Sequence, residues 1–217
     1  MVLLDIIIIT SMSIFAVVSV VWYFRMRKKM IVLMKNITED LERIFKPVDK
    51  TYVLLGYLVG YRAKYELENG DKVYILFTTA PRYSILYYPI LKILKRVDRL
   101  EIAIANYNRY VSKELHAVLA SDVRTHALLL RDLGSKKEVI STRTIDTAKG
   151  QYIVYYEDSG DIEFMKKFLD VASLRVYRVS AFTKSNLVGL VTEIREGTIP
   201  EAVKLLREVN RYVTKTK

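Results

Sequence analysis

The chain has 217 residues, no cysteine, an apolar fraction of 51% and a formal net charge of +11. This apolar content excludes a disordered tail, and the absence of cysteine excludes disulfides, thiolate metal sites and a cysteine nucleophile. The positive charge favours anionic partners, which beside a membrane are lipid headgroups and RNA. A surface charge that only solubilises the domain is the plain alternative.

Residues 6–24 form an uncharged, mostly apolar run, and Arg25, Arg27, Lys28 and Lys29 follow it directly. A helix of this length rises about 1.5 Å per residue and covers a hydrocarbon core of roughly 30 Å. A cleavable signal peptide carries its positive charges before the apolar run, which is the reverse of this order. The positive-inside rule therefore predicts a single-pass cell-membrane protein with its N-terminus outside and residues 25–217 in the cytoplasm. A buried core helix is the alternative.

The boundary of the apolar run has the composition of a membrane interface. Trp22, Tyr23 and Phe24 lie where an interfacial aromatic belt is expected. The basic residues that follow are our candidates for contact with lipid headgroups: Arg25, Arg27, Lys28 and Lys29.

Residues 30–46 predict an amphipathic helix that ends before Pro47, and Asn36 with Glu39 resembles a capping box near its start. The pattern leaves open whether this helix lies on headgroups or packs on the domain. The apolar positions at helical spacing are Ile37, Leu41, Ile44 and Phe45. We divide the chain into a transmembrane anchor with its basic stop (1–29), a connecting helix (30–47) and a basic domain (48–217).

The first part of the domain predicts a hairpin, a helix and a strand. Residues 52–67 and 72–79 are strand-like and are joined at Asn69-Gly70, which suits a type I′ turn. Gly56 and Gly60 within the first run indicate a bulge or a close contact. Residues 83–97 predict a helix, with Pro89 near a start or kink, and residues 99–107 alternate like a strand.

The middle and the end of the chain complete the fold prediction. The type of residues 115–120 and 126–131 is ambiguous, and residues 139–147 predict an edge strand or a long loop. Strand, helix, strand and strand are then predicted over 151–156, 162–171, 174–182 and 187–194. A last helix opens with the capping box Thr198-Ile199-Pro200-Glu201. This order predicts an α+β fold, in which a single transmembrane helix precedes a cytoplasmic mixed sheet covered by helices.

No catalytic motif is evident in the sequence, which lacks a P-loop, a dinucleotide fingerprint, a zinc-protease motif and a nucleophile elbow. His116 and His126 lie in apolar segments without a carboxylate cluster, which indicates structural roles. Asp158 and Asp161 resemble a metal loop, but a helix N-cap explains them more simply. We therefore expect a protein that is not an enzyme and has no cofactor or metal, with a membrane-bound enzyme as the rival hypothesis.

Two groups of basic residues are candidates for contact with ribosomal RNA. The first has helical spacing, which brings its charges onto one surface: Lys92, Lys95, Arg96 and Arg99. The second lies in loops among Tyr107, Asn108 and Tyr110, a mixture that suits irregular RNA: Arg109, Lys113, Arg124, Arg131, Lys136 and Lys137. A merely solvated charged face is the alternative for either group.

The order of these parts resembles the calumin family over residues 4–213. Two features support the resemblance: a terminal helix bearing a Leu-Leu pair, and the segment Ile90-Leu91-Lys92-Ile93-Leu94-Lys95-Arg96-Val97-Asp98. That family provides the ribosome- and translocon-binding subunit of the PAT complex, which assists the insertion of multipass membrane proteins. Its members carry a long acidic segment before the anchor and a long charged helical tail, so we expect a minimal, archaeal form here.

The resemblance implies a membrane-anchored, non-catalytic adaptor and chaperone for membrane-protein insertion at the Sec translocon. The partners it implies are the ribosome through its rRNA, the translocon, a small multipass membrane protein and anionic lipids. The alternative is a structural accessory subunit of another membrane complex, such as a respiratory or transport assembly.

Overall fold

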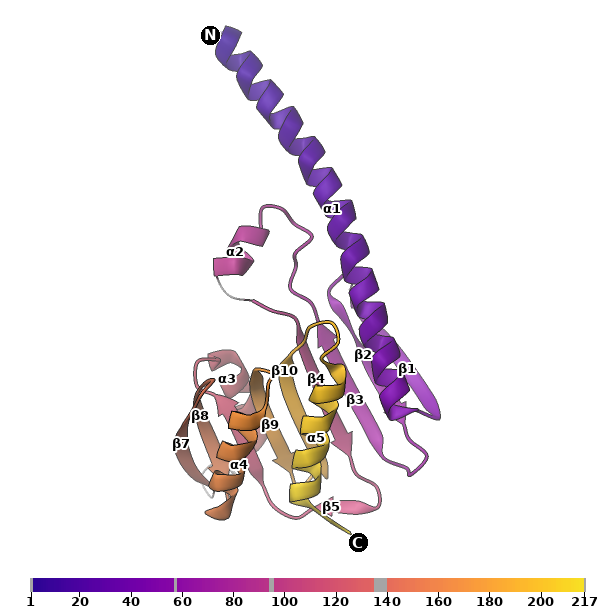
Figure 1. The fold of residues 1–217 in the computed structure, drawn as a ribbon, viewed down its shortest axis with the longest axis vertical. Helices are drawn as coiled ribbons and strands as arrows, with labels where there is room; N and C mark the ends of the chain where they lie inside the picture. Colours follow the sequence, from indigo (N-terminus) through magenta and orange to yellow (C-terminus); the bar gives the residue numbers. More distant parts are fainter. Residues whose placement is uncertain (1, 57, 94–95, 135–139, 217) are drawn as a thin grey trace.

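The computed structural model describes residues 2–56, 58–93, 96–134 and 140–216. The helices are α1 (Val2–Phe45), α2 (Tyr88–Ile93), α3 (Val123–Leu133), α4 (Gly160–Val171) and α5 (Ile199–Val213). The strands are β1 (Asp49–Gly56), β2 (Gly60–Glu66), β3 (Lys72–Thr78), β4 (Arg99–Ala105), β5 (Arg109–Val111), β6 (Leu115–Leu119), β7 (Ser141–Thr147), β8 (Gly150–Tyr156), β9 (Val176–Phe182), β10 (Leu187–Glu193) and β11 (Thr214–Thr216). In Figure 1, α1 projects from the sheet domain as a long rod.

A nine-stranded sheet forms the centre of the domain, in the order β1-β2-β3-β4-β10-β9-β6-β8-β7. The short strands β5 and β11 form a separate two-stranded sheet. The predicted α+β class is confirmed. The described pairings are all antiparallel rather than mixed, because apolar periodicity identifies a strand without giving its direction.

Helices pack on both faces of the sheet. The last part of α1, together with α4 and α5, covers one face and encloses the main core (Figure 1). The helix α3 packs on the opposite face, where Leu129 and Leu133 join Val118 and Tyr155 in a smaller cluster. Strands β6 and β8 supply residues to both clusters because successive side chains point to opposite faces.

The predicted anchor and the predicted connecting helix form one unbroken helix, α1. Its first part is long and apolar enough to cross a membrane, with a mean hydropathy of 2.4 over an 18-residue window that is 0% buried. Its last part lies in the main core through Ile37, Leu41 and Phe45. Asn36 is inside the helix, and its amide donates to Glu196 at 2.8 Å, so no helix begins at the predicted capping box. The connecting helix therefore packs on the domain.

The first and last helices of the chain are in contact. The Arg207 guanidinium of α5 donates to the Ile44 carbonyl oxygen at 3.4 Å. The same guanidinium lies 5.8 Å from the centre of the Phe45 ring. The main core thus includes residues from both ends of the sequence.

Residues 52–67 form parts of two strands rather than one. The turn between β1 and β2 is flanked by Gly56 and Gly60, which have φ angles of 143° and 142°. A Cβ atom on Gly60 would lie 2.0 Å from the carbonyl oxygen of Phe77, so this position requires glycine. The predicted close contact is therefore confirmed at Gly60. The sequence does not indicate this turn, because the apolar pattern continues through Leu58, which is buried.

The hairpin predicted at Asn69-Gly70 is confirmed, with Glu66 paired to Lys72 across β2 and β3. Its turn differs from type I′, because Gly70 has a positive φ of 83° and Asn69 does not. The Gly70 amide donates to the Leu67 carbonyl at 2.9 Å. This geometry is that of a type I turn followed by a left-handed glycine.

The capping box predicted for α5 is replaced by other contacts, whereas the cap predicted for α4 is found in part. At the start of α5, the Thr198 hydroxyl donates to the Arg195 carbonyl at 2.7 Å. Glu201 accepts a hydrogen bond from the Ser173 amide at 2.8 Å instead of completing the box. At the start of α4, the Asp158 carboxylate accepts a hydrogen bond from the Gly160 amide at 3.3 Å, as the predicted N-cap role requires. Asp161 lies within α4, where one carboxylate oxygen accepts from the Asp158 amide at 3.3 Å and the other makes a contact outside the helix.

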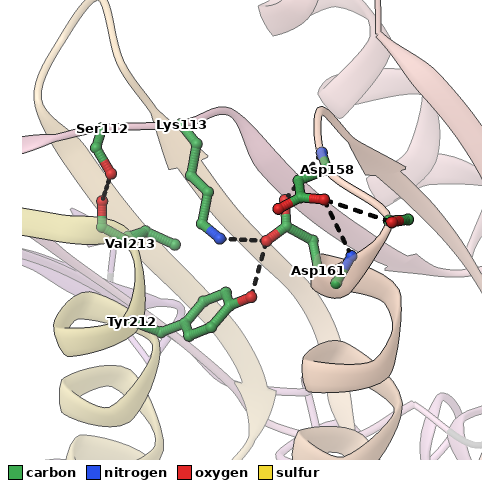
Figure 2. A network of polar contacts seen from close by, with 8 residues as sticks. Ser112, Lys113, Asp158, Asp161, Tyr212 and Val213 are labelled. Carbon is green, nitrogen blue, oxygen red and sulfur yellow. Dashed lines mark hydrogen bonds and ion pairs between the residues drawn. The ribbon is translucent and has the colours of Figure 1, made fainter.

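That contact is an internal polar network in which Asp161 joins α4 to α5 and to the segment before β6 (Figure 2). Asp161 is fully buried, and it accepts hydrogen bonds from the Lys113 ammonium and from the Tyr212 hydroxyl, the latter at 2.9 Å. Burial disfavours the charged form of Lys113, but hydrogen bonds to Asp161 and Tyr212 outweigh it and raise the Lys113 pKa.

Replacing Asp161 with asparagine should destabilise the fold, because it leaves the mostly buried Lys113 ammonium without its counter-charge. We expect the free energy of unfolding to fall by about 2–3 kcal/mol, measured by denaturant titration of the full chain in detergent. Asp146→Asn is the matched control, since Asp146 is exposed, and it should change stability by less than about 0.5 kcal/mol. Equal effects of the two variants would contradict the role given to the network.

Stability should also fall at alkaline pH, in part through Tyr152. Its buried hydroxyl donates to the Val176 carbonyl at 2.7 Å, and burial raises its pKa to about 12. The folded state therefore holds this proton more tightly than the unfolded chain, and stability decreases as pH rises from about 10 toward 12.

We expect Tyr152→Phe to be about 1 kcal/mol less stable than the native chain at pH 8. The variant should also lose about 2 kcal/mol less than the native chain between pH 8 and pH 11.5. Denaturant titrations at both pH values measure the difference. Parallel pH profiles for the two proteins would refute this assignment.

Candidate membrane-proximal interface

The loop between β3 and β4 carries α2 and extends away from the sheet toward α1 (Figure 1). The sequence predicts a helix over residues 83–97, whereas the observed helix covers only Tyr88–Ile93. Residues 94–95 lie outside the described residues. Pro89 is in the first turn of α2, where its missing N–H costs nothing and its ring disfavours helix before it. Pro89 therefore marks a start, one of the two roles predicted for it.

Aromatic contacts join this loop to α1 at the end of the apolar run. The Trp22 ring lies 5.1 Å from the Tyr88 ring. The Trp22 indole N–H donates to the Arg82 carbonyl oxygen at 3.1 Å. The rings of Tyr23 and Tyr83 meet edge to face at 6.2 Å. The loop thus reaches α1 at a level that precedes the basic residues of the anchor.

Asp98 closes the base of the loop. Asp98 is 5% exposed, and its carboxylate accepts a hydrogen bond from the Ala80 amide at 2.8 Å and pairs with Arg82. The Asp98 carbonyl accepts from the Ile194 amide at 3.0 Å, which fixes this end of the loop to the strand β10 side of the sheet. Both ends of the loop are therefore held together.

Asp98→Ala should release this closure. We expect hydrogen exchange at the Ala80 amide to accelerate about tenfold or more, because the lost hydrogen bond is worth at least about 1.4 kcal/mol. Exchange in β8 should be unchanged. Asp71→Ala is the control: its carboxylate accepts from the Tyr107 amide at 2.8 Å in a different loop. The hypothesis fails if Asp98→Ala leaves the exchange of residues 80–93 as it is in the native chain.

A cavity of about 520 Å³ lies between the base of this loop and α3. It brings together Arg96, Arg99 and Arg124, which belong to separate clusters in the sequence, and adds Arg178, which the sequence analysis did not select. Arg96 and Arg124 are exposed, and neither makes an ion pair with another of the described residues. We refer to this cavity as the arginine groove.

The other two arginines of the groove are paired. Arg99 lies 2.7 Å from the Asp122 carboxylate, and its guanidinium is 4.1 Å from the centre of the Tyr177 ring. Partial burial disfavours ionisation of Asp122. Hydrogen bonds from Thr125 and the positive charge of Arg99 outweigh that effect and lower the Asp122 pKa.

Arg178 bridges two carboxylates, with nitrogen–oxygen distances of 2.7 Å to Glu101 and 3.3 Å to Asp132. It is mostly buried, and so it holds β9 to neighbouring elements. The exposed cations of the groove are therefore Arg96 and Arg124, while Arg99 and Arg178 form its paired floor.

The remaining predicted RNA-contact residues are dispersed. Lys92 and Arg131 are exposed on α2 and α3, and the Lys92 ammonium lies 5.2 Å from the centre of the Tyr88 ring. Arg109 is exposed on β5 at the opposite end of the sheet (Figure 1), and Lys113 is engaged with Asp161. Lys95, Lys136 and Lys137 lie outside the described residues.

The headgroup candidates lie together on α1. Arg25, Lys28 and Lys29 are exposed, and Arg27 is half-buried. A shallow cavity of about 270 Å³ is lined by Phe24, Arg27, Lys28, Ile31 and Val32. Apolar and basic side chains thus alternate here along one helix.

Both histidines make specific internal contacts. The His116 Nε2 lies 3.0 Å from the Glu114 carboxylate, and its ring packs 4.7 Å from that of Phe182. The His126 Nε2 lies 2.8 Å from the Tyr155 hydroxyl. Within the described ranges, no group of three or more His, Cys, Asp or Glu side chains is placed to hold a metal ion.

Compared with known protein families and with functionally characterised proteins, the chain matches none. The function is therefore inferred from the geometry of the β3–β4 loop and the arginine groove. Two exposed guanidinium groups at a concave surface suit the binding of phosphate groups. The apolar loop and the arginine groove adjoin each other, since Arg96 and Val97 of the loop line the groove.

Proposed function

We propose that this chain is a single-pass membrane protein that acts as a non-catalytic adaptor in membrane-protein insertion. In this proposal α1 crosses the membrane with its N-terminus outside, and the basic domain lies at the cytoplasmic surface. There it binds the ribosome through rRNA beside the Sec translocon, together with a small multipass partner and anionic lipids. These partners are the ones that the resemblance to the calumin family implies.

The continuity of α1 is the observation that supports this proposal most strongly. The helix passes from the apolar run into the core without a break, so no flexible linker separates a membrane-spanning segment from the domain. From residue 24 to residue 45 it extends for about 30 Å. A domain held at a fixed height and angle is suited to presenting one surface to a large partner at the membrane.

The arginine groove supports RNA as a partner. Arg96 and Arg124 expose guanidinium groups that can pair with backbone phosphates, and the chain carries a net charge of +11. Irregular RNA surfaces are recognised through such phosphate contacts together with shape. The loop that carries Arg96 also contacts α1, which keeps this cation near the membrane end of the domain.

Co-sedimentation with ribosomes tests the proposal. Membranes containing the full chain are solubilised in mild detergent and sedimented with ribosomes over a range of salt concentrations. We expect enrichment at low salt that declines as salt rises, because phosphate contacts release counterions. The double variant Arg96→Glu, Arg124→Glu should reduce the slope of log affinity against log salt by about 1 to 2.

Arg109→Glu is the matched control, because Arg109 is also exposed but lies on β5, at the opposite end of the domain. It should bind ribosomes like the native chain. Absence of ribosome enrichment at low salt would refute the proposal. Crosslinking in native membranes that recovers respiratory or transport subunits instead of translocon components would favour the accessory-subunit alternative.

A further inference from the structure

We infer that residues 82–93, here named the interfacial segment, are embedded in the lipid interface beside α1, so that the protein contacts the bilayer through two separate parts of its chain. The occupant of this surface is lipid. The inference requires that α1 spans the membrane, but it does not require ribosome binding.

The interfacial segment exposes large apolar side chains. Leu86 is 71% exposed, Ile93 is 78% exposed and Ile90 is 43% exposed. Residues 83–91 contain no charged side chain. An apolar patch of this kind at a loop tip indicates a contact surface for protein or membrane. Its position relative to α1 favours the membrane.

The contacts with α1 fix the depth of the segment. Trp22 bonds to the Arg82 carbonyl and packs on Tyr88, and Tyr23 packs on Tyr83. Trp22 precedes Arg25, Arg27, Lys28 and Lys29 by three to seven positions, or about 5–10 Å along the helix. When α1 spans a bilayer and those cations lie among the headgroups, the interfacial segment therefore reaches the edge of the hydrocarbon.

The order of residue types in the segment supports lipid rather than a protein partner. An uncharged apolar stretch rich in tyrosine is followed by Lys92, Lys95 and Arg96. This repeats the order in α1, where the apolar run is followed by an aromatic boundary and basic residues. Tyrosine is enriched at membrane interfaces, and lysine and arginine extend from apolar surfaces to phosphates. The exposed surface of the segment is thus continuous in character with the lipid-facing surface of α1.

Single-cysteine labelling tests the inference, because the native chain contains no cysteine. Leu86→Cys and Ile93→Cys place an NBD fluorophore on the segment, at side chains whose exposure makes the substitutions tolerable. Ile14→Cys is the lipid-exposed reference on α1. Tyr107→Cys is the aqueous reference, at a residue 65% exposed in the loop after β4. The full-length proteins are reconstituted into vesicles of phosphatidylcholine and phosphatidylglycerol.

We expect probes at positions 86 and 93 to be quenched by lipids carrying a nitroxide near the headgroup. Iodide in the aqueous phase should quench them at least threefold less than it quenches the probe at 107. Equal iodide quenching at 86, 93 and 107 would overturn the inference while leaving the membrane-spanning role of α1 intact. Strong iodide quenching of the probe at position 14 would overturn both the inference and the membrane-spanning role of α1.

The choice of lipid over protein is tested by repeating the measurement in native membranes. Protection from iodide in protein-free vesicles supports direct lipid contact, since no other partner is present. Protection that occurs in native membranes and is lost in pure lipid vesicles would assign the segment to a protein partner and overturn the inference.

Discussion

The packing of Ile37, Leu41 and Phe45 against the sheet is the interaction on which the rest of this structure depends. Through this packing, α1 is both the long apolar helix and a structural part of the domain. Phe45 lies 6.4 Å from the buried ring of Tyr65, whose hydroxyl is 2.8 Å from that of Tyr52. Without the last part of α1, this end of the sheet would expose aromatic side chains to water. The domain and the helix are therefore one folding unit.

The same helix also organises the side of the domain where the β3–β4 loop meets α1. Trp22 and Tyr23 contact the loop that carries α2, and Asp98 holds the base of that loop to the sheet. Basic residues on this side differ in their pairing. Arg99 is neutralised by Asp122, while Arg96 is exposed. Sequence charge alone does not reveal this distinction, since it depends on which carboxylates the fold brings near.

Much of the fold could be predicted from local pattern. The long apolar run, the Asn69-Gly70 hairpin and the stripe of the last helix are signals within a few neighbouring residues, and each corresponds to an observed element. The failures involve tertiary contacts. Residues 52–67 are divided by a turn in which the Leu58 and Val59 carbonyls accept hydrogen bonds from Thr79, and Thr198 turns back to Arg195 instead of capping α5.

The candidate site was predicted less completely than the fold. Arg96, Arg99 and Arg124 were selected on charge, but their meeting around one cavity depends on how the β3–β4 loop approaches α3. Arg178 was missed because it is a single cation in an apolar strand, and only its contacts with Glu101 and Asp132 give it a partner. Lys113 was selected on charge and proves to be engaged with Asp161.

The contact between α1 and α5 has a consequence for the order in which the protein matures. Synthesis produces α1 well before α5, yet Ile44 and Phe45 of α1 contact Arg207 of α5. The part of α1 that contacts α5 therefore stays exposed until residues 199–213 have been translated, although Phe45 can pack against Tyr65 of β2 earlier. If the apolar part of α1 enters a bilayer during this delay, the bilayer would hold that surface in place until the core closes.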